Sequence, residues 1–201
     1  MIKAVILDLG GVVVPLDFQR GYATFSNLTP YSSGEIERRI LATGLIDELE
    51  TGRVEPEEFA RLMSAALDLD IPFSQFSELW GSIFLPDTLI SEELLVKIGR
   101  RNKLLLLSNT NAIHFDFIQR NYPLMERFDD FVLSHEVGVM KPGAEIYRVA
   151  IERAGCLPEE CFFTDDRQEN VTGALREGIE SCRFTTQERL VAELVSRGVA
   201  F

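Results

Sequence analysis

The chain has 201 residues, of which 46% are hydrophobic and 26% charged, so it can bury a sizeable core and has an ordinary globular composition. Its formal net charge of −12 argues against a nucleic-acid partner, because a polyanion would be repelled. No apolar run reaches the roughly 18 residues of a membrane span, and the run before Asp8 is too short for a signal-peptide core. We therefore expect a cytoplasmic protein with no membrane partner, either a monomer or a homodimer.

The first predicted element is a strand at Ala4–Leu7, an unbroken apolar run that Asp8 ends. The segment that follows, from about residue 15 to residue 89, shows helical periodicity and no convincing strand. Pro56 suits the first turn of a helix that ends near Leu67. Two residue pairs fit further helices, namely Ser32 with Glu35 as a capping box and Trp80 with Phe84 on one face. Residues 15–89 are therefore predicted to form an all-helical cap over the edge of a sheet.

The rest of the chain, residues 90–201, alternates apolar runs with helical patterns. The runs do not alternate with period two, so they predict strands buried on both faces, at Leu104–Leu107, Phe131–Leu133 and Cys161–Phe163. Helices are expected at Ala112–Asn121, Ala144–Ala154 and Gln168–Glu177. A fifth strand is expected at Ile179–Phe184, and then a helix to about Ser196 opened by a capping box of Thr185 and Glu188. This order predicts an α/β fold with a doubly wound parallel sheet, whose core domain comprises residues 1–14 and 90–201.

Polar residues follow three of the predicted strands. Asp8 comes after the first, Ser108 after the second, and Asp165 and Asp166 after the fourth. In a parallel sheet the carboxyl ends of the strands lie along one edge, where ligands bind. The sequence therefore predicts a functional site at this edge, beneath the cap.

The same residues carry a resemblance to a known family. The opening Val5–Val13 resembles the first motif of the haloacid dehalogenase-like superfamily. Later motifs of the superfamily follow in order, at Ser108-Asn109-Thr110, Lys141-Pro142 and Asp165-Asp166 with Asn170. The resemblance spans the whole chain and is nearest to small phosphatases of the glucose-1-phosphatase type, which share the Asp-Leu-Gly opening and the Ser-Asn-Thr motif. It implies a Rossmann-like core and the Mg²⁺-dependent hydrolysis of a small phosphate ester, a phosphorylated metabolite such as a sugar phosphate, through an aspartyl-phosphate on Asp8.

The resemblance also implies a role for each motif residue. Asp8 is the nucleophile, and Lys141 holds the nucleophile and the phosphate together. Mg²⁺ is expected on Asp8, Asp166 and the backbone carbonyl of Gly10, all of which offer oxygen ligands. Substrate phosphate is expected at Ser108, Asn109 and Lys141, and Asp165 and Asn170 are expected to support the site.

One position departs from the family pattern. Active phosphatases of the superfamily usually carry a second aspartate two residues after the nucleophile, which acts as general acid and base, whereas this chain has Gly10. Losing such a group typically costs about 10²–10⁴-fold in rate. Asp17 at the start of the cap and Glu50 within it could replace it, and His114 could contact substrate or be a core histidine. The gap leaves two alternatives open: a metal-independent 2-haloacid dehalogenase, or a catalytically weak ligand- or partner-binding protein.

Overall fold

The computed structural model describes residues 1–199, and the last two residues of the predicted core domain lie outside this range. Its five strands, β1 (Ala4–Leu7), β2 (Lys103–Ser108), β3 (Asp130–Leu133), β4 (Cys161–Asp165) and β5 (Glu180–Arg183), form one parallel sheet in the order β3-β2-β1-β4-β5. The chain builds outward from β1 on one side and then crosses to the other. The predicted doubly wound α/β fold is confirmed, and β1 lies at the point where the strand order reverses.

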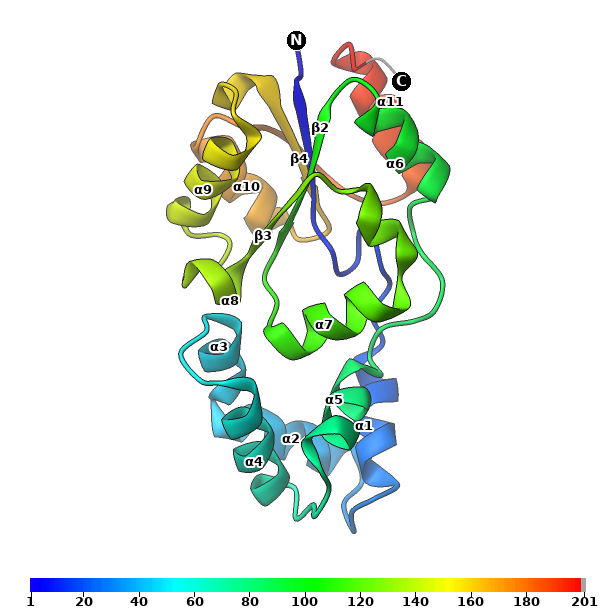
Figure 1. Cartoon of the computed structure of the whole chain (residues 1–201), viewed down its shortest axis with the longest axis vertical. Helices are drawn as coiled ribbons and strands as arrows, with labels where there is room; N and C mark the ends of the chain where they lie inside the picture. Colours follow the sequence, from blue (N-terminus) through cyan, green and yellow to red (C-terminus); the bar gives the residue numbers. More distant parts are fainter. Residues whose placement is uncertain (200–201) are drawn as a thin grey trace.

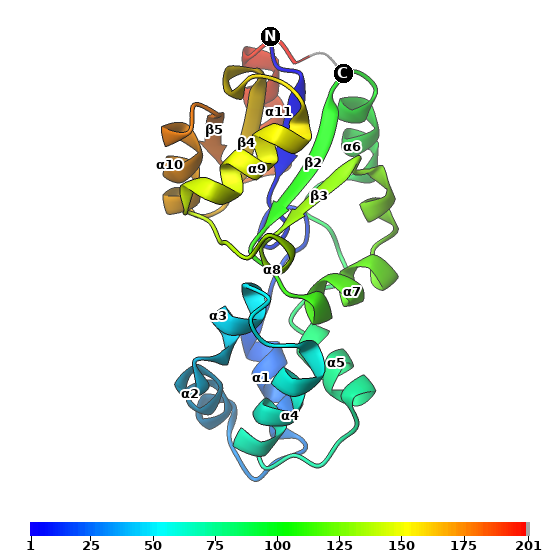
Figure 2. The same ribbon diagram turned by 60° about the vertical axis from the view of Figure 1, so that its left-hand side comes forward.

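Helices bury both faces of this sheet (Figure 2). One face packs on α9 (Ala144–Ala154) and α10 (Gln168–Arg176), in a cluster that includes Ala4 and Ile6 of β1. The opposite face packs on α6 (Glu92–Gly99), α7 (Ala112–Asn121) and α11 (Gln187–Ser196), with Val5 and Leu7 of β1. Because successive strand residues point to opposite faces and both faces are covered, the strands read as continuous apolar runs.

Residues between β1 and α6 supply five helices that gather at one end of the molecule, beyond the edge where the strands end (Figure 1). They are α1 (Phe18–Ser26), α2 (Ser33–Thr43), α3 (Leu45–Glu50), α4 (Pro56–Ala66) and α5 (Phe73–Gly81). These helices share an apolar cluster that includes Phe25, Phe59, Phe76 and Trp80, and Ile113 of α7 joins it from the core. We call these five helices the cap.

The two linkers between cap and core run side by side. The Asp17 N–H donates to the Ile83 carbonyl at 2.8 Å, and the Leu85 N–H donates to the Pro15 carbonyl at 3.1 Å. These linkers lie near the predicted ends of the cap, residues 15 and 89. The boundaries of the cap and core domains remain a proposal. The paired linkers fix where the cap leaves the sheet edge.

Most predicted helix ends agree with the structure. Ser32 caps α2 by accepting from the Glu35 N–H, and Pro56 is the first residue of α4. Thr185 was the wrong cap, because Thr186 accepts from the Arg189 N–H and opens α11. The shared face for Trp80 and Phe84 was also wrong, because α5 ends at Gly81 and Phe84 instead forms a bridge with Leu16.

Three short elements complete the described chain: η1 (Pro123–Arg127), α8 (Ser134–Val137) and η2 (Pro158–Glu160). Of these, α8 matters for the site because α3 of the cap packs against it. None of the helices between residues 1 and 199 combines the length and the apolar character needed to cross a membrane.

Candidate active site

Asp8 lies one residue beyond β1, between the ends of β2 and β4. Its backbone N–H donates to the Thr164 carbonyl at 3.0 Å, which continues the register of β1 against β4. The same register brings Ser108 at the end of β2 and Asp165 at the end of β4 to this edge. Polar residues separated by about 100 positions or more in the sequence therefore meet because parallel strands end together.

Lys141 is the fixed cation of the site. Its buried Nζ donates to Asp8 Oδ1 and to Asp165 Oδ2, each at 2.7 Å, and to the Leu107 carbonyl at 2.9 Å. Burial opposes the charge, but the two carboxylates prevail and raise the pKa of Lys141. A permanently charged ammonium bonded to Asp8 can neutralise an anionic ligand placed beside it.

Asn109 holds the backbone of Lys141 in place. Its side-chain oxygen accepts from the Lys141 N–H at 2.8 Å, and its Nδ2 donates to the Lys141 carbonyl at 2.9 Å. Asn109 lines the cavity beside Ser108, as the sequence predicts, but both ends of its amide are engaged with Lys141. In this structure Asn109 orients the lysine.

Asp165 is oriented from three sides. Asn170 donates to both of its carboxylate oxygens at 3.0 Å, the Arg167 N–H donates to Oδ1 at 2.9 Å, and Lys141 binds Oδ2. Asp165 and Asn170 are both buried. The two predicted supporting residues are therefore brought together, in a network that aligns Lys141.

The donor set at this edge fits a hard cation. Ligand oxygens of Asp8, Asp165 and Asp166 all lie within 4.8 Å of one another. Three carboxylates gather here around the single ammonium of Lys141. Burial raises the pKa of Asp8, and burial with the charge of Asp165 raises that of Asp166, so both carboxylates are costly to ionise without a further cation. Clustered carboxylate oxygens are the ligands that Mg²⁺ prefers.

Two glycines after Asp8 shape this corner. Gly11 has a φ of +78°, and a Cβ there would lie 2.7 Å from Asp166 Oδ2, so only glycine leaves room for that carboxylate. A Cβ on Gly10 would meet Leu16 Cδ1 at 2.7 Å. Leu16 therefore covers the position from which an aspartate in place of Gly10 would extend.

A cavity of about 270 Å³ opens above Asp8 between the core and the cap. The predicted residues that line it are Asp8, Gly10, Glu50, Ser108, Asn109, Lys141, Asp166 and Asn170. Asp17 does not line it, since its side chain accepts from the Arg20 N–H and caps α1. Of the two candidates for the missing acid and base, the structure places only Glu50 in the cavity.

Glu50 is held over the core at the end of α3. The loop that follows packs tightly on α8, because a Cβ on Gly52 would overlap the His135 carbonyl oxygen. Burial raises the pKa of Glu50 to about 7, with a further contribution from Asp47. A carboxyl group with this pKa can both donate and accept a proton near neutrality.

His114 links the cap to the core without carrying charge. Its backbone N–H donates to Asn111 Oδ1, so Asn111 Nδ2 is free to donate to the ring nitrogen Nδ1. The other ring nitrogen, Nε2, therefore carries the proton and donates to the Trp80 carbonyl at 3.2 Å. Burial lowers the pKa of His114 to about 4. His114 lines the cavity as a neutral wall between α7 and α5.

Leu9 and Thr110 also line the cavity and lie within the motifs around Asp8 and Ser108. Outside the motifs, the lining residues that were not predicted are Leu16, Phe18, Ile83, Phe84 and Arg167. Arg167 directly follows the Asp165-Asp166 pair, and this adjacency was the signal in the sequence that could have identified it. The apolar residues belong to the linkers and to α1, and no sequence motif marks them.

Comparisons with known proteins agree with this geometry. The family model described as haloacid dehalogenase-like hydrolase matches residues 2–178. The chain belongs to this family. It is 27% identical over 177 residues to a D-ribitol-5-phosphate phosphatase from Bacteroides thetaiotaomicron, covering 85% of this chain and 86% of the relative. It is also 24% identical over 200 residues to the sesquiterpene phosphatase astK from Aspergillus oryzae, covering 96% and 94%.

Solved structures give the same result. A HAD-family enzyme from Bacteroides thetaiotaomicron superposes with a TM-score of 0.86 at 28% identity, covering 96% of this chain and 98% of that one. A complex of that enzyme with magnesium and inorganic phosphate superposes with a TM-score of 0.84 at 29% identity, covering 93% and 96%. The predicted Mg²⁺ cofactor is in keeping with that complex. An L-2-haloacid dehalogenase from Xanthobacter autotrophicus, at 23% identity and a TM-score of 0.64, shares the fold, covering 100% of this chain and 85% of that one.

Proposed function

We propose that this hydrolase cleaves small phosphate monoesters with Mg²⁺ and forms an aspartyl-phosphate on Asp8. The observation that carries the proposal is the Asp8 carboxylate itself, bonded to buried Lys141 at 2.7 Å and clustered with Asp165 and Asp166 on the floor of a cavity. A dehalogenase needs no cation, so three clustered carboxylates favour phosphoryl transfer.

The chemistry proceeds in two displacements at phosphorus. Lys141 binds Oδ1 of Asp8, which leaves Oδ2 to attack; the P–O bond to the alcohol breaks, and water later attacks the aspartyl-phosphate to release phosphate. Lys141 and Ser108 bind the phosphoryl oxygens, and Asp165 and Asn170 keep Lys141 in place. When bound on Asp8, Asp166 and the Gly10 carbonyl, Mg²⁺ supplies Lewis-acid neutralisation of the phosphoryl charge.

Glu50 takes the acid–base role that Gly10 cannot fill. Protonated Glu50 donates to the departing alkoxide, and the resulting carboxylate then removes a proton from the attacking water. Its place on the cavity wall and its pKa near 7 support this role. The alcohol product therefore leaves neutral, and Glu50 returns to its starting state after each turnover.

The substrate class is a small phosphorylated metabolite. One relative is named a D-ribitol-5-phosphate phosphatase and another, which shares 39% identity over 58 residues, a glyceraldehyde 3-phosphate phosphatase, from Methanopyrus kandleri; the aligned stretch covers 28% of this chain and 25% of that relative. Both names refer to polar phosphate esters, as the sequence-based expectation of a sugar phosphate does. The cavity of about 270 Å³ suits a ligand of this size.

The direct test uses p-nitrophenyl phosphate with purified protein. We expect hydrolysis that requires Mg²⁺ and disappears in Asp8→Asn. Halide release from a 2-haloacid without metal would instead identify a dehalogenase. No phosphate release and no halide release would favour a binding protein. Asp166→Ala should lower Mg²⁺ affinity, measured by calorimetry, by about tenfold or more.

A further inference from the structure

A second chamber adjoins the phosphate cavity on its cap side. It has a volume of about 80 Å³ and shares Phe18, Glu50, Ile83 and His114 with the walls of the phosphate cavity. The two spaces are therefore neighbours that meet at these four residues. A ligand with its phosphate at Asp8 would reach the chamber if its alcohol portion extended past them.

The chamber walls are mainly apolar. Tyr22, Phe25, Ile40 and Ile46 line it from α1, α2 and α3. Of its polar lining residues, Asn111 and His114 are bonded to each other, which leaves Glu50 and the Tyr22 hydroxyl. Such walls bind hydrocarbon surface and offer a sugar few hydrogen-bond partners.

Trp80 is the chamber residue that can report on binding. Phe76 stacks on its indole at 5.7 Å between centroids and His114 at 5.6 Å, both nearly parallel. Its Nε1 is buried and has no hydrogen-bond partner among the described residues, so it offers a ligand no accessible donor. The ring therefore contributes apolar surface to the chamber wall.

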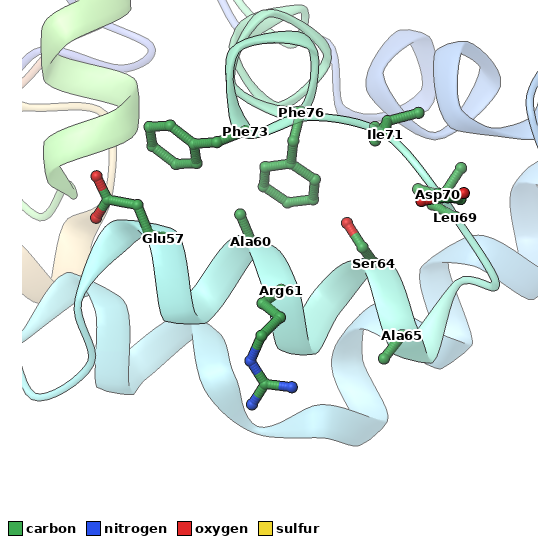
Figure 3. Close-up of a pocket in the computed structure, with 10 residues that line it drawn as sticks. All are labelled: Glu57, Ala60, Arg61, Ser64, Ala65, Leu69, Asp70, Ile71, Phe73 and Phe76. Carbon is green, nitrogen blue, oxygen red and sulfur yellow. The ribbon is translucent and has the colours of Figure 1, made fainter.

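A hollow on the outer side of the cap differs from the chamber in its position and in its charged lining residues (Figure 3). It lies between α4 and the segment around Ile71 and Phe73, and Glu57, Arg61 and Asp70 are among its lining residues. It shares no lining residue with the cavity above Asp8. It therefore serves as an internal comparison for the chamber.

We propose that the chamber binds an apolar portion of the substrate alcohol, so that phosphate esters of small apolar or aromatic alcohols are preferred over the polar esters to which the relatives' names refer. The inference rests on the proposed function, because it places the phosphoryl group at Asp8. At about 10–15 Å³ for each water-sized volume, the chamber admits a group of roughly five to eight non-hydrogen atoms. A phenyl ring or a five-carbon branched chain meets this limit.

Binding can be measured without turnover, because Trp80 is the only tryptophan of the chain. We expect benzylphosphonate, titrated with Mg²⁺ present, to change Trp80 fluorescence and to bind about 10–100-fold more tightly than methylphosphonate. Equal affinities, or a bound benzyl group that leaves the fluorescence unchanged, would overturn the inference. Ile46→Phe should fill the chamber and remove the preference, whereas Ile71→Phe, the same substitution in the outer hollow, should keep it.

Turnover separates the chamber from the proposed reaction. We expect benzyl phosphate to exceed D-ribitol 5-phosphate in kcat/KM by about tenfold or more, because both are esters of primary alcohols but only one fills the chamber. The opposite order, with p-nitrophenyl phosphate still hydrolysed, would overturn the chamber and leave the function standing. Tight benzylphosphonate binding without hydrolysis of any ester would overturn the function and leave the chamber as a binding site.

Discussion

The two sides of the active-site cavity are built in different ways. On the core side, adjacent strand ends fix Asp8 and Asp165, and Lys141 joins them through two bonds of 2.7 Å. On the cap side, Glu50 depends on one short helix and on the tight contact of Gly52 with the His135 carbonyl. The core residues are therefore held by several bonds at adjacent strand ends, while the cap carries the proposed proton donor on a single short helix and its contact, and lines the proposed space for the alcohol.

The largest effect is expected on the core side, from Lys141→Met. Removing the cation leaves Asp8 and Asp165 buried without their partner, which should lower the free energy of unfolding by about 3–5 kcal/mol and abolish measurable turnover. Urea denaturation checks the first part. The control is Lys97→Met, which breaks an exposed pair with Glu93 and should cost less than about 1 kcal/mol.

On the cap side, Glu50→Gln should lower kcat for an alkyl phosphate by about 10²–10⁴-fold. Because Glu50 must be protonated to act as the acid, the wild-type cleavage step, followed in a single turnover, should slow as pH rises through about 7, and Glu50→Gln should lose this dependence. Glu48→Gln, an exposed change in the same helix, should match the wild type.

The prediction for Glu50 can be sharpened by placing an aspartate at position 10, where the family usually has one. Adding Gly10→Asp to Glu50→Gln should recover part of the lost rate, since the added side chain meets only the flexible end of Leu16. If Gly10→Asp restores nothing while the protein stays folded, the idea that Glu50 stands in for the missing aspartate is wrong.

A smaller effect is expected from the contact between cap and core, where Gly52 lies against the His135 carbonyl. Gly52→Ala forces a Cβ into the His135 carbonyl at a φ of +66°, which should cost about 1–3 kcal/mol and lower kcat by moving Glu50. Gly44→Ala has the same φ of +66° and open space around it, so it reports the backbone cost alone. Equal kcat values for the two variants would show that the contact does not position Glu50.

The smallest effect is expected from Asp17→Asn. Asparagine caps a helix as well as aspartate does, so stability should change by less than about 0.5 kcal/mol and kcat should stay the same. Thermal melting and steady-state kinetics measure both. A large loss of kcat would return Asp17 to the list of acid–base candidates.

The sequence predicts the core better than the cap for a physical reason. Strands buried on both faces show as apolar runs, and Ala4–Leu7 is predicted to the residue; the polar residue after each run then marks the site. Asp8 and Asp166 follow from motifs at those ends, and their convergence needs no knowledge of the loops because parallel register brings strand ends together. Lys141 has a motif of its own but lies in the loop between α8 and α9, so the register does not place it.

What the sequence could not predict depends on contacts between distant segments. His114 is neutral because burial lowers its pKa to about 4; its ring nitrogens bond Asn111 and the Trp80 carbonyl, and nothing in its local sequence indicates the second partner. Phe84 continues a helical pattern but lies past the end of α5, where pairing with Leu16 overrides the periodicity. The apolar chamber likewise arises from residues of α1, α2, α3, α5 and α7 and of a linker, which only packing brings together.

The central claim is that Asp8 becomes phosphorylated, and chemical trapping tests it most directly. Protein mixed with Mg²⁺ and substrate, then quenched with borohydride, should carry homoserine at position 8 by peptide mass spectrometry, because the reagent reduces an acyl phosphate and leaves a free carboxylate unchanged. The modification should be absent without Mg²⁺ and in Asp8→Asn. Full hydrolytic activity with no reducible acyl group on Asp8 would contradict the account.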